Sequence, residues 1–310
     1  MQAECTLTLS LFGAATLHLV QPQGAVRLLP LCTQSRNLLV YLAVAPGGTR
    51  SRRELSQALC VDGAEPARPG SVNSALWRLR HALESPPFAA GEFLYKQRDG
   101  QVGLRADPRL KIDIEAYLQN VLPVLALPLD AVDAATTEQL RRGAALYAGD
   151  LLPGAQDDWV LREREKLRRH QLNALGRLVQ LSVRAGDTAA GIRYAQAILD
   201  IDDMREDVHR DLMRLFLLDG QRALALRQYE RCREVLRREL SIVPMPETQA
   251  LYRQIAADAL ARQGMAAEGE RPSGHAADAR DSALAELLVS ARRHLAAADA
   301  QLVRATPPPH

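Results

Sequence analysis

The residues whose types and spacing could do chemistry lie on one predicted helix, which covers residues 69–84. At helical spacing, one face of this helix is an apolar stripe formed by Val72, Leu76, Leu79 and Leu83. The opposite face carries amide, hydroxyl, indole, guanidinium and imidazole groups from Asn73, Ser74, Trp77, Arg78 and His81. No carboxylate interrupts that face before Glu84. Because such groups meet phosphates and base edges, this helix is predicted to enter the major groove of double-stranded DNA. The alternative is an ordinary solvated surface helix.

Cations gather on a predicted hairpin that follows this helix. Its strands, Phe93–Gln97 and Gln101–Arg105, flank Arg98-Asp99-Gly100, and an Asp-Gly pair favours a tight primed turn. The cations on the hairpin and just before the helix are Arg68, Lys96, Arg98 and Arg105. Such side chains hold a phosphate backbone without reading its sequence, so we predict that they add to DNA contact.

Several elements ahead of the helix complete a small domain. Alternating apolar residues predict three short strands in an antiparallel sheet, over residues 6–11, 15–20 and 25–29. A helix is expected over Thr33–Ala45, and Ser51 with Glu54 forms a capping box that opens a second helix. The order of sheet, three helices and hairpin is that of a winged helix, with the third helix for the major groove and the wing beside the backbone.

Five short runs in this region resemble the DNA-binding domain of SARP-type (antibiotic-regulatory) transcriptional activators. They are RNLLVYLA at 36–43, Pro46-Gly47, SRREL at 51–55, ALWRLR at 75–80, and Ala82-Leu83. The resemblance implies a winged helix of the OmpR type, binding to direct repeats near promoters, and recruitment of RNA polymerase. The chain departs from the family at Cys60, where a Trp is common, and at Trp77, where a small or polar residue is usual.

A second resemblance lies further along the chain. The run YAGDLLPG at 147–154, followed by Asp158-Trp159-Val160, is similar to the opening of the bacterial transcriptional activator domain, which follows the winged helix in the same family. Before it, Asp113 is expected to cap a helix that reaches Leu122, and residues 123–128 are a candidate connection.

An internal repeat supports a helical domain independently of any family. At an offset of 34 residues, Leu178, Leu181, Gly186, Ala189, Ile192 and Arg193 fall on Leu212, Leu215, Gly220, Ala223, Leu226 and Arg227. This is the period of tetratricopeptide (TPR) helix pairs, which stack and present a concave face. The predicted fold class is therefore mainly α with a small N-terminal β part: a winged helix (α+β) followed by an all-α tetratricopeptide-like repeat domain.

The predicted domains are a winged helix over 1–108, a helical activator domain over 109–262, a flexible linker over 263–281 and an amphipathic helix over 282–305. In that last helix, apolar residues recur in steps of four and three at Leu284, Leu288, Ala291, Leu295, Ala298 and Leu302. Docking on the repeat domain is favoured slightly over a coiled-coil dimer.

Enzyme chemistry is not indicated. The chain has no GxxxxGK[ST] phosphate loop, no GxSxG elbow and no HExxH or Cys/His ligand spacing, so no cofactor, metal or catalytic residue is predicted. Four cysteines without a CxxC pair and the lack of a signal peptide or membrane span favour a cytoplasmic protein. The net charge of +2 requires any DNA-binding patch to be local.

We therefore predict a bacterial transcriptional activator that binds promoter DNA. Its expected partners are double-stranded promoter DNA, RNA polymerase (from the resemblance) and a second copy in a possible homodimer, with no membrane. One alternative is a TPR-type scaffold whose winged helix mediates protein contacts. The other is a ligand sensor with little DNA binding of its own, although the repeats show no obvious buried polar cluster in sequence.

Overall fold

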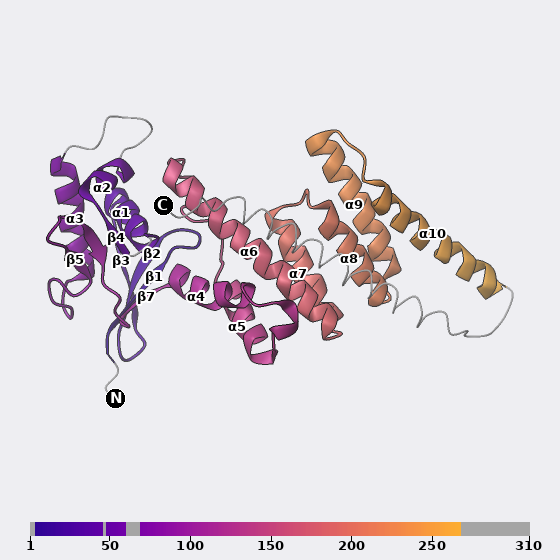
Figure 1. The fold of residues 1–310 in the computed structure, drawn as a ribbon, viewed down its shortest axis with the longest axis horizontal. Coiled ribbons are helices and arrows are strands. Elements are labelled where there is room, and N and C mark those ends of the chain that lie inside the picture. The colour runs from indigo at the N-terminus through magenta and orange to yellow at the C-terminus, as the bar shows by residue number, and fades with distance from the viewer. Residues whose placement is uncertain (1–3, 46–47, 60–68, 268–310) are drawn as a thin grey trace. The chain divides into compact units, whose positions relative to one another are not determined.

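The computed structural model describes residues 4–45, 48–59 and 69–267, with side chains up to residue 257 in the last stretch. Arg68, most of the predicted linker and the predicted helix 282–305 lie outside these residues. The fold class is confirmed: a small β part near the N-terminus precedes a long helical part (Figure 1). The described chain divides into two compact units. Unit 1 contains residues up to Val124 with Glu138–His170, and unit 2 contains Leu125–Thr137 with residues from Gln171 on.

The N-terminal sheet of unit 1 has one strand more than predicted. Strands β1 (Thr6–Ser10), β2 (Thr16–Val20) and β3 (Val26–Leu29) pair antiparallel, as expected. The prediction of a purely antiparallel sheet is wrong, because β7 (Leu110–Ile112) adds parallel to β1. A strand of three residues is too short to show an alternating pattern in sequence.

Three helices pack on one another after this sheet: α1 (Thr33–Ala43), α2 (Arg52–Ala58) and α3 (Pro69–Leu83). The capping box at the start of α2 is confirmed. The apolar stripe of α3 differs from the predicted one in one position: Ala75 is buried, whereas Leu76 is only half-buried. Ala75 faces α1, where the Ser35 hydroxyl donates to its carbonyl oxygen at 3.3 Å.

The wing is a three-stranded sheet in the order β4 (Thr49–Arg50), β6 (Val102–Leu104), β5 (Leu94–Lys96). The prediction of a primed turn is wrong. Arg98 and Asp99 have negative φ, the Gly100 N–H donates to the Gln97 carbonyl at 3.1 Å, and Gly100 itself has φ 88°. This three-residue connection places the left-handed residue last, as in a G1 bulge, so glycine is needed there and not at both central positions.

Helix α4 (Asp113–Leu125) continues through Pro123, so the connection predicted over residues 123–128 begins only after Leu125. A proline lacks the N–H that would bond to the carbonyl four residues earlier, here that of Gln119. The Gln139 side chain, from α5 (Ala134–Ala145), donates to this carbonyl at 3.3 Å and supplies the missing bond. A short 3-10 helix, η2 (Leu129–Ala131), lies between α4 and α5.

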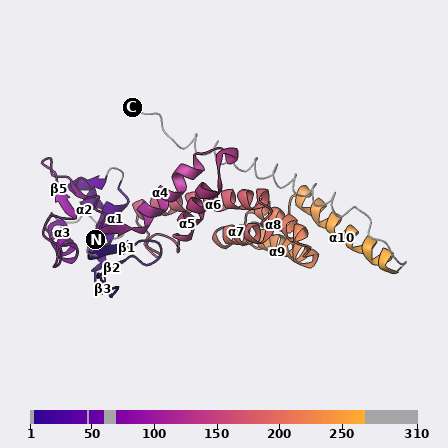
Figure 2. The same cartoon turned by 90° about the horizontal axis from the view of Figure 1, so that it is seen from below.

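The helical repeat is confirmed in unit 2. Helices α7 (Thr188–Ile201), α8 (Glu206–Leu218) and α9 (Arg222–Leu240) pack on one another in succession (Figures 1 and 2). The second half of α6 (Asp158–Arg184) shares their apolar core through Leu175, Val179 and Val183. Gly186 and Gly220, 34 positions apart, end α6 and α8 with φ of 73° and 75°. Helix α10 (Pro246–Ala267) extends a few residues past the predicted domain end at 262.

The repeats do contain buried polar groups, contrary to the expectation from sequence. The His209 side chain in α8 is 1% exposed; its Nε2 donates to the Asp203 carbonyl at 2.9 Å and its Nδ1 accepts from Gln228 Nε2 at 2.6 Å. Burial lowers the pKa of His209, so the imidazole is held neutral. The bond to Gln228 joins α8 to α9, and the bond to Asp203 joins α8 to the connection that precedes it.

Candidate nucleic-acid interface

The predicted front of α3 is an exposed polar surface. Asn73, Ser74, Trp77, Arg78 and His81 are all exposed. The Trp77 side chain is 68% exposed and stacks on His81, with ring centroids 5.8 Å apart and an interplanar angle of 3°. Trp77 therefore does not cover the base of the wing. The Ser74 hydroxyl donates to the Gly70 carbonyl at 2.9 Å, so its oxygen is left to accept.

Arg78 extends from this face towards the start of α1. Its Nη1 lies 3.9 Å from the Sγ of Cys32, an exposed residue at the N-cap of α1. Hydrogen bonds with Ser35 lower the pKa of the Cys32 thiol, and the positive charge of Arg78 lowers it further. The guanidinium is exposed, so it can reach a base edge or a phosphate.

Asn73 has a neighbour that sequence reasoning missed. The Nη2 of Arg52, the first residue of α2, donates to Asn73 Oδ1 at 2.7 Å. Both side chains are exposed. The amide oxygen of Asn73 is therefore already bonded to a cation. No signal in the sequence links two residues 21 positions apart on different helices.

The wing presents its cations to solvent. Lys96, Arg98 and Arg105 are all exposed. The Arg105 guanidinium lies over the Tyr95 ring, 5.2 Å from its centroid, which restrains the side chain without neutralising its charge. Arg80 ties α3 to the wing, because its Nη2 donates to the Leu94 carbonyl at 3.4 Å.

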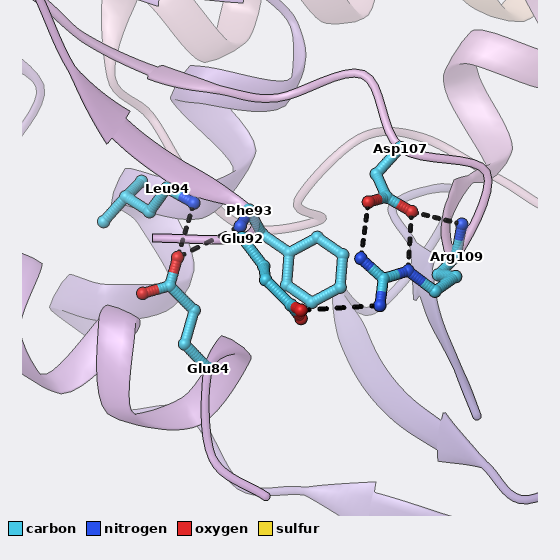
Figure 3. Close-up of polar contacts among 6 residues, drawn as sticks. All are labelled: Glu84, Glu92, Phe93, Leu94, Asp107 and Arg109. Atoms are coloured by element: carbon cyan, nitrogen blue, oxygen red, sulfur yellow. Dashed lines mark hydrogen bonds and ion pairs between the residues drawn. The ribbon is translucent and has the colours of Figure 1, made fainter. Parts of the chain in front are cut away.

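Glu84, at the end of α3, fixes the base of the wing (Figure 3). Its side chain is fully buried, so it faces inward and is not part of the exposed front. Its two carboxylate oxygens accept from the backbone N–H groups of Gly91, Phe93 and Leu94 at 2.7, 3.1 and 2.7 Å. Arg80 Nε lies 3.3 Å from the same carboxylate. Helix α3 and strand β5 of the wing are therefore joined by one buried carboxylate.

A second ionic cluster lies beside the first in Figure 3. Arg109 pairs with Asp107 at 2.8 Å and with Glu92 at 3.6 Å, and its guanidinium packs near the rings of Phe88 and Phe93. Its hydrogen bonds with Asp107 raise the pKa of Arg109 and lower that of Asp107. Arg109 is thereby used internally and does not add to the exposed cations of the wing.

Across the described residues, no group of three His, Cys, Asp or Glu side chains is placed to hold a metal ion. In the same part of the chain, no helix is both long enough and apolar enough to cross a membrane.

The chain is similar to known proteins both in sequence and in fold. Residues 112–256 match the bacterial transcriptional activator domain family. The regulatory protein AfsR of Streptomyces coelicolor is 26% identical over 223 residues, which cover 72% of this chain and 22% of AfsR. The chain thus spans less than a quarter of the length of that relative.

A solved structure shares the fold. The structure of Mycobacterium tuberculosis EmbR in complex with a low affinity phosphopeptide matches with a TM-score of 0.61 at 19% identity, over 92% of this chain and 70% of that one. Residues 112–256 are therefore similar to the bacterial transcriptional activator domain, and the comparisons are consistent with a SARP-type activator that has an N-terminal winged helix.

Proposed function

We propose that this regulator is a cytoplasmic activator that binds promoter DNA in a sequence-specific manner. Residues 1–108 bind the DNA, with α3 in the major groove and the wing along the backbone. Residues 109–262 contact RNA polymerase or a partner protein, and a second copy binds the adjacent site of a direct repeat. The observation that carries the proposal is the exposed front of α3, which holds amide, indole, guanidinium and imidazole groups with no carboxylate among them.

The two alternatives have weaker support. A protein-binding scaffold has no need of three exposed cations on a hairpin beside that helix. A ligand sensor would place its polar groups around an open site, whereas the ring nitrogens of His209 are both bonded within the repeat. DNA binding, by contrast, accounts for both the polar front of α3 and the exposed cations of the wing.

The proposal is tested by footprinting the purified full chain on the region upstream of its own gene, and by selecting binding sites from random duplexes. Protection of two copies of one short sequence at a helical-turn spacing is expected. Binding that is independent of sequence, or no binding at all, contradicts the proposed function.

The wing cations are expected to act through charge alone. Replacing Lys96 and Arg98 together by Ala should weaken binding to every duplex and lower the slope of log K against log salt by about two, since each cation releases about one counterion. The matched control removes Arg233 and Arg237 from the surface of α9, where both pair with glutamates. A fall in discrimination between sites with an unchanged slope would mean that the wing reads bases.

A further inference from the structure

The contact between Arg52 and Asn73 affects which DNA base α3 would select. The capping box at Ser51 fixes the first turn of α2, and Arg52 is the first residue of that helix. Its Nη2 lies 2.7 Å from Asn73 Oδ1, at the short end of the range for a hydrogen bond and typical of one assisted by charge. Asn73 stands near the start of α3 and is exposed, so the pair lies on the surface offered to DNA.

The amide of a free asparagine reads adenine by two bonds at once. Its oxygen accepts from the adenine N6 amino group, and its nitrogen donates to N7. In this protein the amide oxygen of Asn73 already accepts from Arg52. The guanidinium also brings a positive charge to the place where the adenine amino group, itself a donor, would approach.

What remains of the pair is rich in donors, and the one lone pair left on the Asn73 oxygen lies beside a guanidinium charge. Asn73 offers its amide N–H groups, and Arg52 offers its other guanidinium N–H groups, since arginine has no acceptor. The major-groove edge of guanine presents two acceptors, N7 and O6, whereas that of adenine presents an acceptor and a donor. A surface rich in donors and carrying a positive charge therefore complements guanine better than adenine, whose amino group is itself a donor.

We infer that Arg52 is a specificity-determining residue, which converts Asn73 from an adenine reader into part of a guanine-selecting pair. The inference rests on the proposed function, because it concerns the base that α3 contacts. Arg53, the next residue and also exposed, provides the matched control: its removal takes away the same charge from the same turn of α2.

Binding-site selection with the full chain tests this inference in four proteins: the native chain, Arg52→Ala, Arg53→Ala and Asn73→Ala. Loss of preference in Asn73→Ala identifies the base pair that Asn73 contacts. The native chain should prefer guanine there by about tenfold. Arg52→Ala should shift the preference to adenine by a similar factor, while Arg53→Ala lowers affinity for all sequences and keeps guanine. Thermal melting checks that each variant is folded, and Ser51 and Glu54, which cap α2, are unchanged.

Three results overturn the inference and leave the proposed function intact. They are a native preference for adenine at that base pair, retention of guanine in Arg52→Ala with only a uniform loss of affinity, and no change of preference in Asn73→Ala. A native chain that selects no sequence at all would instead refute the proposed function, and the inference with it.

Discussion

Replacing Glu84 by Ala is expected to lower the free energy of unfolding of unit 1 by about 3–5 kcal/mol. The carboxylate is buried and accepts three backbone N–H groups of the segment that leads into the wing, so its removal leaves those donors without a partner. It also leaves Arg80 without its ion pair. The free energy is measured by urea denaturation of the full chain, followed by near-ultraviolet circular dichroism.

The control for this variant is Glu92→Ala, since Glu92 is a half-buried carboxylate whose ion pair with Arg109 spans 3.6 Å. Glu92→Ala should lower the free energy of unfolding by about 1 kcal/mol or less. If both substitutions lowered the free energy of unfolding equally, the buried carboxylate of Glu84 would not be what stabilises the base of the wing.

The second large effect is expected at Arg164, in the first half of α6. Its guanidinium donates to the carbonyl oxygens of Leu151, Leu152 and Ala155 at 3.0, 2.7 and 3.2 Å, and so clamps the YAGDLLPG segment. That segment needs a clamp, because Leu152 adopts a positive φ of 44°, which is uncommon for a residue other than glycine.

The clamped segment also bonds to the connection between β1 and β2. The Gly13 N–H donates to the Asp150 carbonyl at 3.0 Å, and Phe12 packs on Tyr147 with ring centroids 4.8 Å apart. The segment that most resembles the activator domain therefore joins that domain to the winged helix within unit 1.

Arg164→Ala should accordingly destabilise unit 1 by about 2–4 kcal/mol and increase protease cleavage between residues 147 and 157. The exposed Arg162 on the same helix is the control, and its replacement by Ala should cost about 0.5 kcal/mol or less. Unchanged cleavage of the segment in Arg164→Ala would contradict its role as a clamp.

Periodic patterns in the sequence predicted most of the fold. The spacing within residues 69–84 gave the bounds of α3 to within one residue and placed five polar side chains on one exposed face. The offset between Gly186 and Gly220 predicted the helical repeat, because a left-handed residue must end the first helix of each pair. Both features depend on local rules, which a sequence displays directly.

Contacts between distant residues could not be predicted in this way. Asp113 is expected from the sequence to cap its own helix, and one of its carboxylate oxygens does accept from the Ile114 N–H at 2.7 Å. The other oxygen accepts from the backbone of Leu11 and Phe12, about 100 positions earlier, which the sequence does not indicate. The bonds of Arg52 to Asn73 and of Gln139 to the Gln119 carbonyl likewise depend on how two helices pack. Such pairs have no spacing signature, so these hydrogen bonds are visible only in the folded chain.

The central claim is that the front of α3 reads DNA, and the most direct test is the affinity of Arg78→Ala for the site selected by the native chain. If Arg78 contacts a base, specific binding should weaken by about 1–3 kcal/mol and the preference at one base pair should relax. Binding to unrelated duplexes should change much less, and Arg233→Ala, which removes a paired charge from α9, should leave both unchanged. Equal affinity of the native chain and Arg78→Ala for every duplex, with both proteins folded, would contradict the account.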